Sequence, residues 1–254
     1  MHMTLEGESN QLQEVFLVVG SDTGVGKTVF TGLLGRYLLK RDLSVALVKP
    51  FCSGDVGDIN FLKRANAESD QSEVNYWYGD EPISPAAWEL RTGEQIDLER
   101  VLASLKREIG RKKSDIILIE GVGGLLAPLN KRETVASLGQ SLGAKLIVVA
   151  PNRVGVVNHV LLTLETALSR GFSVSSVILM EQEEPDTSAV HNAELVLMHM
   201  PNIPDFKGVF EFICLGNGAD DPDLIANNVK KAEDVLRNIF DVVISPCLFD
   251  DSSS

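Results

Sequence analysis

GSDTGVGKT, residues 20–28, joins an apolar run at 15–19 to a segment at 29–40 that has the composition of a helix. A phosphate-binding loop occurs in a fixed context: a strand, then a glycine-rich loop that ends in Lys-Thr, then a helix. Glycines let backbone N–H groups approach phosphate oxygens closely, and the helix N-terminus adds partial positive charge. We therefore predict that Lys27 contacts the β- and γ-phosphates of a nucleotide and that Thr28 binds its Mg²⁺.

The loop departs from the usual phosphate-loop pattern at one position. The usual pattern has a glycine at position 21, with four residues between it and Gly26. In this chain position 21 is Ser21, and Gly20 lies one residue earlier. The alternative interpretation is an ordinary glycine-rich turn between a strand and a helix. The Lys-Thr pair and the strand-loop-helix order together favour the phosphate loop. The remaining residues expected to contact the nucleotide in this loop are Asp22, Thr23, Gly24, Val25 and Gly26.

Short apolar runs alternate with helical patterns along the rest of the chain. The runs predict strands at 15–19, 44–48, 115–119, 145–150 and 173–179, and helices are predicted at 29–40, 98–110, 135–142, 157–170 and 223–239. Asn228 is expected on the polar face of the last helix. Continuous apolar runs of this length are typical of parallel strands that are covered by helices on both faces. The sequence thus predicts an α/β fold with a doubly wound, mostly parallel sheet.

This α/β fold is expected to form a single domain at 15–245. A disordered leader is predicted at 1–14 and a tail at 246–254. The 254 residues include 36 acidic and 23 basic ones, and the net charge of −13 argues against non-specific binding to nucleic acid and against binding to anionic membranes. No apolar stretch reaches transmembrane length. Three scattered cysteines, Cys52, Cys214 and Cys247, favour neither a disulfide framework nor a metal site, and they fit a reducing cytoplasm.

A second strong pattern is the apolar run at 116–119, which is followed by Glu120 and a glycine-rich segment at 121–124. Ligands of parallel sheets bind at the carboxyl ends of the strands, and a nucleotide site needs an acid there to bind Mg²⁺ or its water shell. The alternative is a solvated glutamate before a glycine turn. The phosphate loop elsewhere in the chain favours the functional interpretation, and we expect Glu120 in the nucleotide and metal sites.

Lys49 and Ser53 follow the second predicted strand. Lys49 stands where a second cation can face a transferred phosphoryl group, and Ser53 can hydrogen-bond a substrate. The alternative for Lys49 is a surface lysine at the end of a strand. Asp55 and Asp58 come next, and one of them is expected to share the Mg²⁺ with the phosphate loop. Asp58 is also a candidate N-cap for the helix that follows.

Five segments, in this order, resemble the dethiobiotin synthetases over about residues 16–177. They are GSDTGVGKT (20–28), KPFCSG (49–54), PISPAA (82–87), EGVGG (120–124) and NHVLLT (158–163). The first and fourth are shared with the related cobyrinic acid amide synthases and ParA-type ATPases, whereas the other three are more particular to dethiobiotin synthetases. The resemblance implies a fold like that of the P-loop NTPases.

The resemblance also implies an ATP- and Mg²⁺-dependent ligase of biotin biosynthesis. Such an enzyme closes a ureido ring and converts 7,8-diaminopelargonic acid and CO₂ to dethiobiotin through a carbamate and a carbamic-phosphoric anhydride. By position, it implies that Lys27 and Lys49 stabilise the transferring phosphoryl group. The residues implied to hold Mg²⁺ are Thr28, Asp58 and Glu120.

The resemblance implies that the substrate is held by residues from two parts of the chain. Ser53 and the backbone at Val122, Gly123 and Gly124 are implied to contact the diamine or its carbamate. It further implies a homodimer with shared active sites, in which Asn158 of the partner subunit binds the substrate carboxylate. The N-terminus of a helix, where Asn158 is predicted to lie, suits an anion of this kind.

The chain departs from the dethiobiotin synthetases at Ala86, where these proteins commonly carry His, and at Met180, where they often carry Asn. Met180 is the position expected beside the nucleotide base, so the base preference stays open. Two other functions also stay open. A related P-loop amidoligase acting on another substrate is compatible with both departures, whereas a ParA-type nucleotide switch is less favoured because no second lysine precedes Lys27 in its loop.

Overall fold

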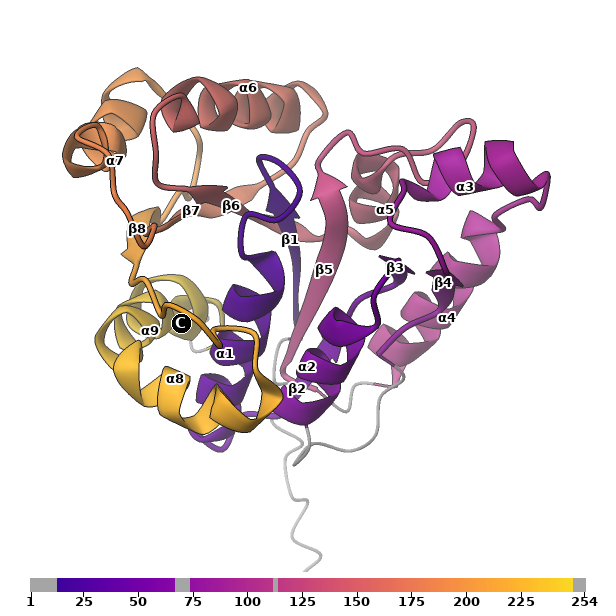
Figure 1. Ribbon diagram of the computed structural model, residues 1–254, viewed down its shortest axis with the longest axis horizontal. Helices are drawn as coiled ribbons and strands as arrows, with labels where there is room; N and C mark the ends of the chain where they lie inside the picture. Colours follow the sequence, from indigo (N-terminus) through magenta and orange to yellow (C-terminus); the bar gives the residue numbers. More distant parts are fainter. Residues whose placement is uncertain (1–12, 67–73, 112–113, 249–254) are drawn as a thin grey trace, which may run out of the picture.

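The central sheet of the protein has six parallel strands in the order β2-β5-β1-β6-β7-β8 (Figure 1). The structure is a computed structural model that describes residues 13–66, 74–111 and 114–248. The strands are β1 (Glu14–Gly20), β2 (Val45–Val48), β5 (Ile116–Gly124), β6 (Lys145–Pro151), β7 (Val174–Met180) and β8 (Gly208–Phe212). All five predicted strands are therefore confirmed, and β8 adds a sixth at one edge.

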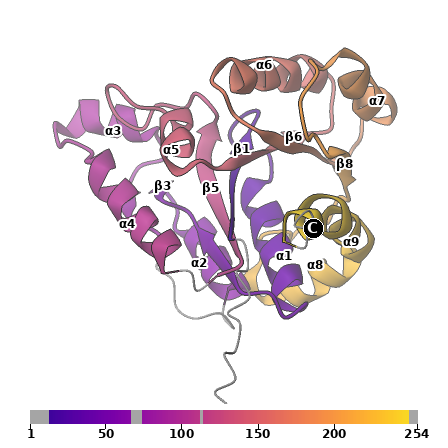
Figure 2. The same cartoon turned by 180° about the vertical axis from the view of Figure 1, so that it is seen from behind.

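Helices cover both faces of this sheet, as Figures 1 and 2 show from opposite sides. One face carries α1 (Lys27–Leu39), α2 (Gly57–Ala65), α8 (Ile225–Lys231) and α9 (Glu233–Ile239). The other face carries α4 (Leu98–Gly110), α5 (Val135–Leu142), α6 (Val156–Ser169) and α7 (Ala189–His199). This arrangement confirms the predicted doubly wound α/β fold in one domain.

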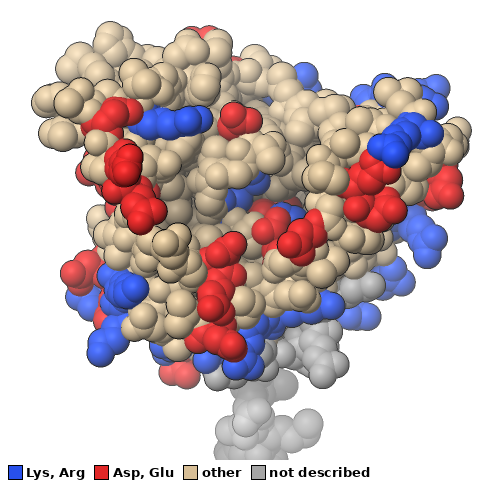
Figure 3. Space-filling model, in the orientation of Figure 1, with Lys and Arg blue, Asp and Glu red and all other residues tan. Residues whose placement is uncertain are grey.

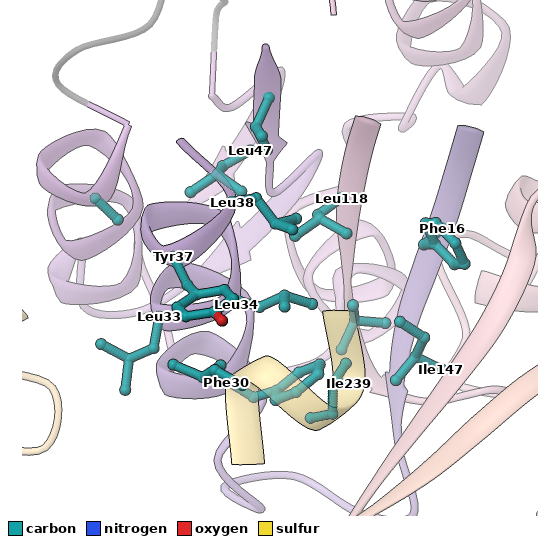
Figure 4. Close-up of a cluster of buried hydrophobic side chains, with 14 of the residues drawn as sticks. Phe16, Phe30, Leu33, Leu34, Tyr37, Leu38, Leu47, Leu118, Ile147 and Ile239 are labelled. Atoms are coloured by element: carbon teal, nitrogen blue, oxygen red, sulfur yellow. The ribbon is translucent and has the colours of Figure 1, made fainter. Parts of the chain in front are cut away.

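The central strand β1 contributes side chains to two hydrophobic cores. Phe16 and Val18 belong to the core under α1, whereas Leu17 and Val19 belong to the core under α5 and α6. Successive side chains of a strand point to opposite faces, so an uninterrupted apolar run is needed when both faces are covered. Figure 4 shows the first core, with Phe30 of α1 beside the α9 helix.

Four further elements were not among the predicted ones. Two three-residue strands, β3 (Phe51–Ser53) and β4 (Trp77–Gly79), form a separate parallel pair. The helices α3 (Pro85–Thr92) and α7 were also not predicted. Strands as short as β3 and β4 carry too few residues to show a period, so their formation depends on contacts with the rest of the fold.

The end of the chain differs from the single helix predicted at 223–239. A 3₁₀ turn at Pro222–Leu224 precedes α8, and the helix is interrupted at Ala232 before α9 begins. A π-helical turn at Phe240–Ile244 then leads into α10 (Ser245–Leu248).

The described residues reach into both segments that were predicted to flank the domain. Helix α10 extends through Leu248, into the segment expected as a tail, and the rest of that segment lies outside the described residues. Of the predicted leader, only Gln13 and Glu14 are described, and Glu14 begins β1. Among the helices that the structure describes, none is long and apolar enough to cross a membrane.

Candidate functional site

A cavity of about 600 Å³ opens where β1, β2 and β5 end. Figure 3 shows a hollow in this face of the molecule, with acidic and basic side chains inside and around it. Parallel strands bring their carboxyl ends to one edge, so segments far apart in sequence meet there. The predicted site residues that line the cavity are Thr23, Gly24, Val25, Gly26, Lys27, Thr28, Lys49, Ser53, Asp58, Glu120, Val122 and Gly123.

The loop after β1 is closed tightly around the ammonium group of Lys27. Lys27 Nζ donates a hydrogen bond to the backbone carbonyl of Asp22 at 3.1 Å. A Cβ atom added at Gly20 would lie 2.3 Å from that same carbonyl oxygen and 2.9 Å from Lys27 Nζ, so only glycine fits there. The N–H of Ser21 donates to the carbonyl of Val149 at 2.9 Å, which ties the loop to β6. The loop therefore keeps its shape with serine at the irregular position.

Two glycines of this loop have left-handed backbone conformations. Gly24 has φ 70°, and no described atom lies within 4 Å of a Cβ added there, whereas Gly26 has φ 95° and caps the N-terminus of α1. A left-handed conformation is readily adopted by glycine and strained for other residues. The first turn of α1 then presents Lys27 and Thr28 to the cavity. This is the geometry that an anion-binding helix N-terminus requires.

Lys49 joins two carboxylates at the floor of the cavity. Its Nζ donates hydrogen bonds to Glu120 Oε1 and to Asp58 Oδ2, each at 2.6 Å. Thr28 Oγ1 donates to the same Oε1 of Glu120 at 2.8 Å. Lys49 is 5% exposed and Glu120 is 1% exposed, so the ion pair between them is withdrawn from solvent.

Burial affects the two lysines of the site in different ways. It lowers the pKa of Lys27, and the carboxylate of Glu120 offsets only part of this effect while the charge of Lys49 adds to it. Burial also favours the neutral form of Lys49, but the charges of Glu120 and Asp58 outweigh it and raise the pKa of Lys49 above its ordinary value. Lys49 is therefore held in its charged form. The charged form of Lys27 is less favoured, and a bound anion would stabilise it.

The oxygen atoms around Lys49 fit a bound Mg²⁺ ion. Glu120 Oε2 is buried and has no hydrogen-bond partner among the described residues. Mg²⁺ in nucleotide sites is bound through one or two carboxylates together with substrate phosphates, rather than by a cage of protein ligands. Accordingly, the described part of the chain has no cluster of three or more His, Cys, Asp or Glu side chains suited to a metal. Glu120, Asp58 and the hydroxyl of Thr28 are the donors that fit.

The structure separates the two aspartates that the sequence left as alternatives. Asp58 lines the cavity and pairs with Lys49, whereas Asp55 uses Oδ1 to accept the N–H of Gly57 at 2.8 Å. The predicted N-cap role of Asp58 is wrong, because α2 begins at Gly57 with Val56 as its N-cap and places Asp58 inside the first turn. Its side chain is thereby free to turn toward Lys49.

Glu120 lies inside a strand and not at its end. Strand β5 continues for four residues beyond Glu120 and pairs again with β1 after a shift in register, so that Gly20 and Gly124 become partners. Gly124 therefore takes part in the pairing of β5 with β1. It was predicted to contact substrate, but it is not among the residues that line the cavity.

Three other predicted site residues lie beside the cavity or away from it. Asp22 contributes its backbone carbonyl to Lys27 and accepts the N–H of Thr23 on its own Oδ1 at 2.7 Å. Met180 is buried at the end of β7, and its Cε would lie 3.0 Å from a Cβ added at Gly26. Asn158 is exposed in the first turn of α6 and does not line the cavity of its own chain.

The opposite wall of the cavity contains residues that were not predicted. Ala219 and Asp220 line it from the loop after β8. This loop is held by Asn228, whose Nδ2 donates to the carbonyls of Gly218 at 3.2 Å and Ala219 at 3.4 Å. Asn228 is 1% exposed, so its predicted place on a polar face is wrong.

Apolar side chains and the hydroxyl of Ser53 also line the cavity. Pro82, Ile83 and Ala127 line it on the side of Ser53. The Oγ of Ser53 is buried and has no hydrogen-bond partner in the described part of the chain. A buried hydroxyl without a partner is costly, and a polar ligand in the cavity would satisfy it.

Known proteins match this chain over most of its length. A family model described as an AAA domain matches residues 14–211. The ATP-dependent dethiobiotin synthetase BioD of Anaeromyxobacter dehalogenans is 36% identical over 179 residues, which cover 68% of this chain and 79% of that protein. The protein of the same name from Chlorobaculum tepidum is 31% identical over 204 residues, covering 77% of this chain and 84% of that protein.

A solved structure has a related fold at low sequence identity. The signal recognition particle receptor FtsY from Elizabethkingia anophelis, in complex with GDP, superposes with a TM-score of 0.50 at 13% identity. The match covers 89% of this chain and 66% of that chain, and it shows a likeness at the level of the fold. The sequence matches are more specific, and they show that the chain belongs to the family of ATP-dependent dethiobiotin synthetases.

Proposed function

We propose that this protein is an ATP-dependent ligase of biotin biosynthesis, which converts 7,8-diaminopelargonic acid and CO₂ to dethiobiotin, ADP and phosphate. The observation that carries the proposal is the meeting of Lys27, Lys49, Thr28, Asp58 and Glu120 at one cavity below a phosphate-type loop. The family membership supports the reaction, and the cavity offers the charges that phosphoryl transfer needs.

In the proposed reaction the two lysines act on the phosphoryl group as it moves from ATP to the carbamate of the substrate. Lys27, at the start of α1, faces the phosphates of the nucleotide, and Lys49 approaches from the end of β2. Both are held before substrate binds, so little reorganisation is needed when negative charge develops. The anhydride formed in this step is then attacked by the second amine, which closes the ring and releases phosphate.

Mg²⁺ is part of the proposal, with Thr28, Asp58 and Glu120 as the residues that hold it. When bound, it neutralises charge on the nucleotide phosphates. The unpartnered Oε2 of Glu120 supports this assignment, because a buried carboxylate oxygen needs a cation or a donor. Lys49 donates a hydrogen bond to the other oxygen of Glu120, so in the proposal one carboxylate binds a lysine and a metal at the same time.

The diamine is proposed to lie between Ser53 and the glycine-rich end of β5. The backbone at Val122 and Gly123 borders the cavity there, and Ser53 offers the free hydroxyl described above. The apolar wall at Ile83 suits the hydrocarbon chain of the substrate. Met180 is proposed to lie beside the nucleotide, because its side chain packs on the phosphate loop.

A homodimer with shared sites is a further part of the proposal. Asn158 is exposed near the N-terminus of α6, and the neighbouring apolar side chains of Val154 and Leu162 are 75% and 55% exposed. Contact with a second copy would cover these side chains and bring Asn158 to the other cavity. Mixing inactive Lys27→Ala and Asn158→Ala chains tests this arrangement, because a mixed dimer regains one intact site and part of the activity. The absence of any regained activity would contradict shared sites.

The experiment that tests the proposed function measures phosphate release from Mg-ATP and bicarbonate with and without 7,8-diaminopelargonic acid, while dethiobiotin is followed by mass. We expect phosphate release that depends on the diamine and matches the dethiobiotin formed. Phosphate release without the diamine, or no release, would contradict the proposal. The cytoplasm as the compartment of this reaction stays a prediction from the scattered cysteines.

A further inference from the structure

Lys49 leaves the central sheet directly after β2, and its main chain is held by a different segment. Its N–H donates to the carbonyl of Val74 at 2.7 Å, and its carbonyl accepts a hydrogen bond from Asn75 Nδ2 at 2.8 Å. Both backbone polar groups of Lys49 are thus bonded to two consecutive residues before β4. We call these two hydrogen bonds the clasp of Lys49.

The amide nitrogen of Asn75 also reaches the start of the small sheet. It donates to the carbonyl of Trp77 at 2.9 Å and lies 3.4 Å from the carbonyl of Pro50. A side-chain amide has two hydrogens, so the bonds to Lys49 and Trp77 use both of them. Asn75 therefore joins the end of β2 to β4 through one atom.

A local role in a turn does not account for these contacts. Asparagine often bonds backbone groups two residues away, and its contact with Trp77 has this spacing. Its contact with Lys49 spans 26 residues of sequence and joins two different elements. The following Pro50 restricts the backbone of Lys49 further, because a residue before proline is confined to extended conformations.

We propose that Asn75 is a positioning residue for Lys49, which fixes the main chain from which the Lys49 ammonium reaches Glu120 and Asp58. The ammonium meets both carboxylates at 2.6 Å, so a small displacement of the Lys49 backbone breaks at least one of these contacts. The expected effect of Asn75 on catalysis rests on the proposed function, in which Lys49 contacts the transferring phosphoryl group.

Two substitutions remove the donors of Asn75. Asn75→Asp keeps the shape of the side chain and can only accept hydrogen bonds when ionised, whereas Asn75→Ala removes the group altogether. Ser44→Ala is the matched control, because Ser44 lies just before β2, at its opposite end, and loses two hydrogen bonds to Asp115, of 2.7 and 2.9 Å. If Asn75→Asp does not fold, Asn75→Ala carries the test.

The first measurement does not depend on activity. Lysines are labelled by reductive methylation and read by peptide mass spectrometry, with the half-exposed Lys131 as an internal reference. Relative labelling of Lys49 is expected to rise on the order of five- to tenfold in the Asn75 variants, as loss of hydrogen bonds opens the clasp. It is expected to stay at the wild-type level in Ser44→Ala. Unchanged labelling of Lys49 in the Asn75 variants would overturn the proposal, whatever product the enzyme makes.

The second measurement is turnover per folded enzyme. In the Asn75 variants kcat is expected to fall on the order of 10- to 100-fold, while the KM for Mg-ATP stays within about twofold. A purely structural role would lower thermal stability and leave kcat per folded enzyme unchanged, and that result would also overturn the proposal. If the wild-type enzyme makes no dethiobiotin, the proposed function fails, and the labelling result still decides whether Asn75 holds Lys49.

Discussion

The ammonium nitrogen of Lys49 lies 2.6 Å from Oε1 of Glu120, and both side chains are buried. Removing one partner of a buried ion pair leaves an uncompensated charge, which is far more costly than the pair itself. The same Oε1 accepts the hydroxyl of Thr28. One carboxylate oxygen therefore links the phosphate loop to the second lysine, and the other oxygen has no hydrogen-bond partner among the described residues.

Substitution Lys27→Ala is expected to lower turnover by at least about 10²- to 10³-fold while the fold persists. A preorganised charge at the transferring group contributes several kcal/mol to the transition state. Dethiobiotin formation and the far-ultraviolet circular dichroism spectrum check both parts. The control is Lys63→Ala on the exposed side of α2, for which activity should not change. Wild-type turnover in Lys27→Ala would remove this residue from the phosphate site.

Substitution Glu120→Gln is expected to raise the Mg²⁺ concentration needed for half-maximal activity by about tenfold or more. The variant keeps the size of the side chain but loses the charge that a hard cation prefers. Lys49 retains Asp58 as an ion-pair partner, so the protein should still fold. A Mg²⁺ titration of activity provides the measurement. An unchanged titration curve would exclude Glu120 as a metal ligand.

The two neighbouring aspartates provide a matched pair of variants. Asp58→Asn should shift the Mg²⁺ titration toward higher concentrations, because Asp58 lines the cavity and contacts Lys49. Asp55→Asn should leave the titration unchanged, since the Oδ1 of Asp55 accepts the backbone N–H of Gly57 at 2.8 Å. The comparison is made at saturating ATP with both variants at equal folded concentration. A larger shift in Asp55→Asn than in Asp58→Asn would reverse the assignment.

Glycine is required at position 20 by the close approach of the loop to itself. In Gly20→Ala the new Cβ would stand 2.3 Å from the carbonyl oxygen of Asp22, so the loop must open and nucleotide binding should be lost. In Gly110→Ala, at the end of α4, no atom of the described residues lies within 4 Å of the new atom, and stability should rise by up to about 1 kcal/mol. Calorimetric titration with ATP and urea unfolding measure the two effects. Tight ATP binding by Gly20→Ala would contradict the described loop.

The loop before α6 should depend on pH through Asp186. The hydroxyl of Ser188 and the backbone N–H of Val154 donate to this carboxylate, at 2.5 and 2.7 Å, and hold the pKa of Asp186 below its usual range. Since the folded-state pKa lies below the unfolded one, the stabilisation is complete above about pH 4 and is lost as the pH falls through the folded-state value.

The variant Asp186→Asn resembles the protonated form of this side chain. Its Tm should therefore lie below that of the wild-type protein at neutral pH, and the difference should shrink as the pH falls toward the folded-state pKa of Asp186. Thermal unfolding across a pH series measures the difference. A difference in Tm that does not vary with pH would show that the charge of Asp186 contributes nothing.

The sequence predicted the parts of the site that depend on local pattern. Lys27 and Thr28 could be placed because a glycine-rich loop between a strand and a helix has a fixed outcome. Glu120 and Lys49 could be placed near them because they follow apolar runs, and parallel strands share one carboxyl edge. The positions of the five central strands were predicted for the same reason, from runs of residues that need cover on both faces.

What the sequence did not predict depends on contacts between distant segments. Asp220 reaches the cavity because the buried amide of Asn228 holds its loop, and an asparagine in a helical segment appears polar until its partners are known. Asn75 bonds the carbonyl of Lys49 across 26 residues that carry no pattern linking them. The choice between Asp55 and Asp58 likewise required the first turn of α2 to be located.

The pairing of Gly20 with Gly124 across β1 and β5 has a consequence for the redesign of this enzyme. The segment proposed to bind the nucleotide and the segment proposed to contact the diamine are paired at these glycines, so exchanging one of them alone would disturb the pairing. A change of substrate specificity by segment exchange therefore requires both segments to be replaced together. The wall at Ile83 and Ala127 lies outside the paired residues, and it is the place where single substitutions can reshape the substrate cavity.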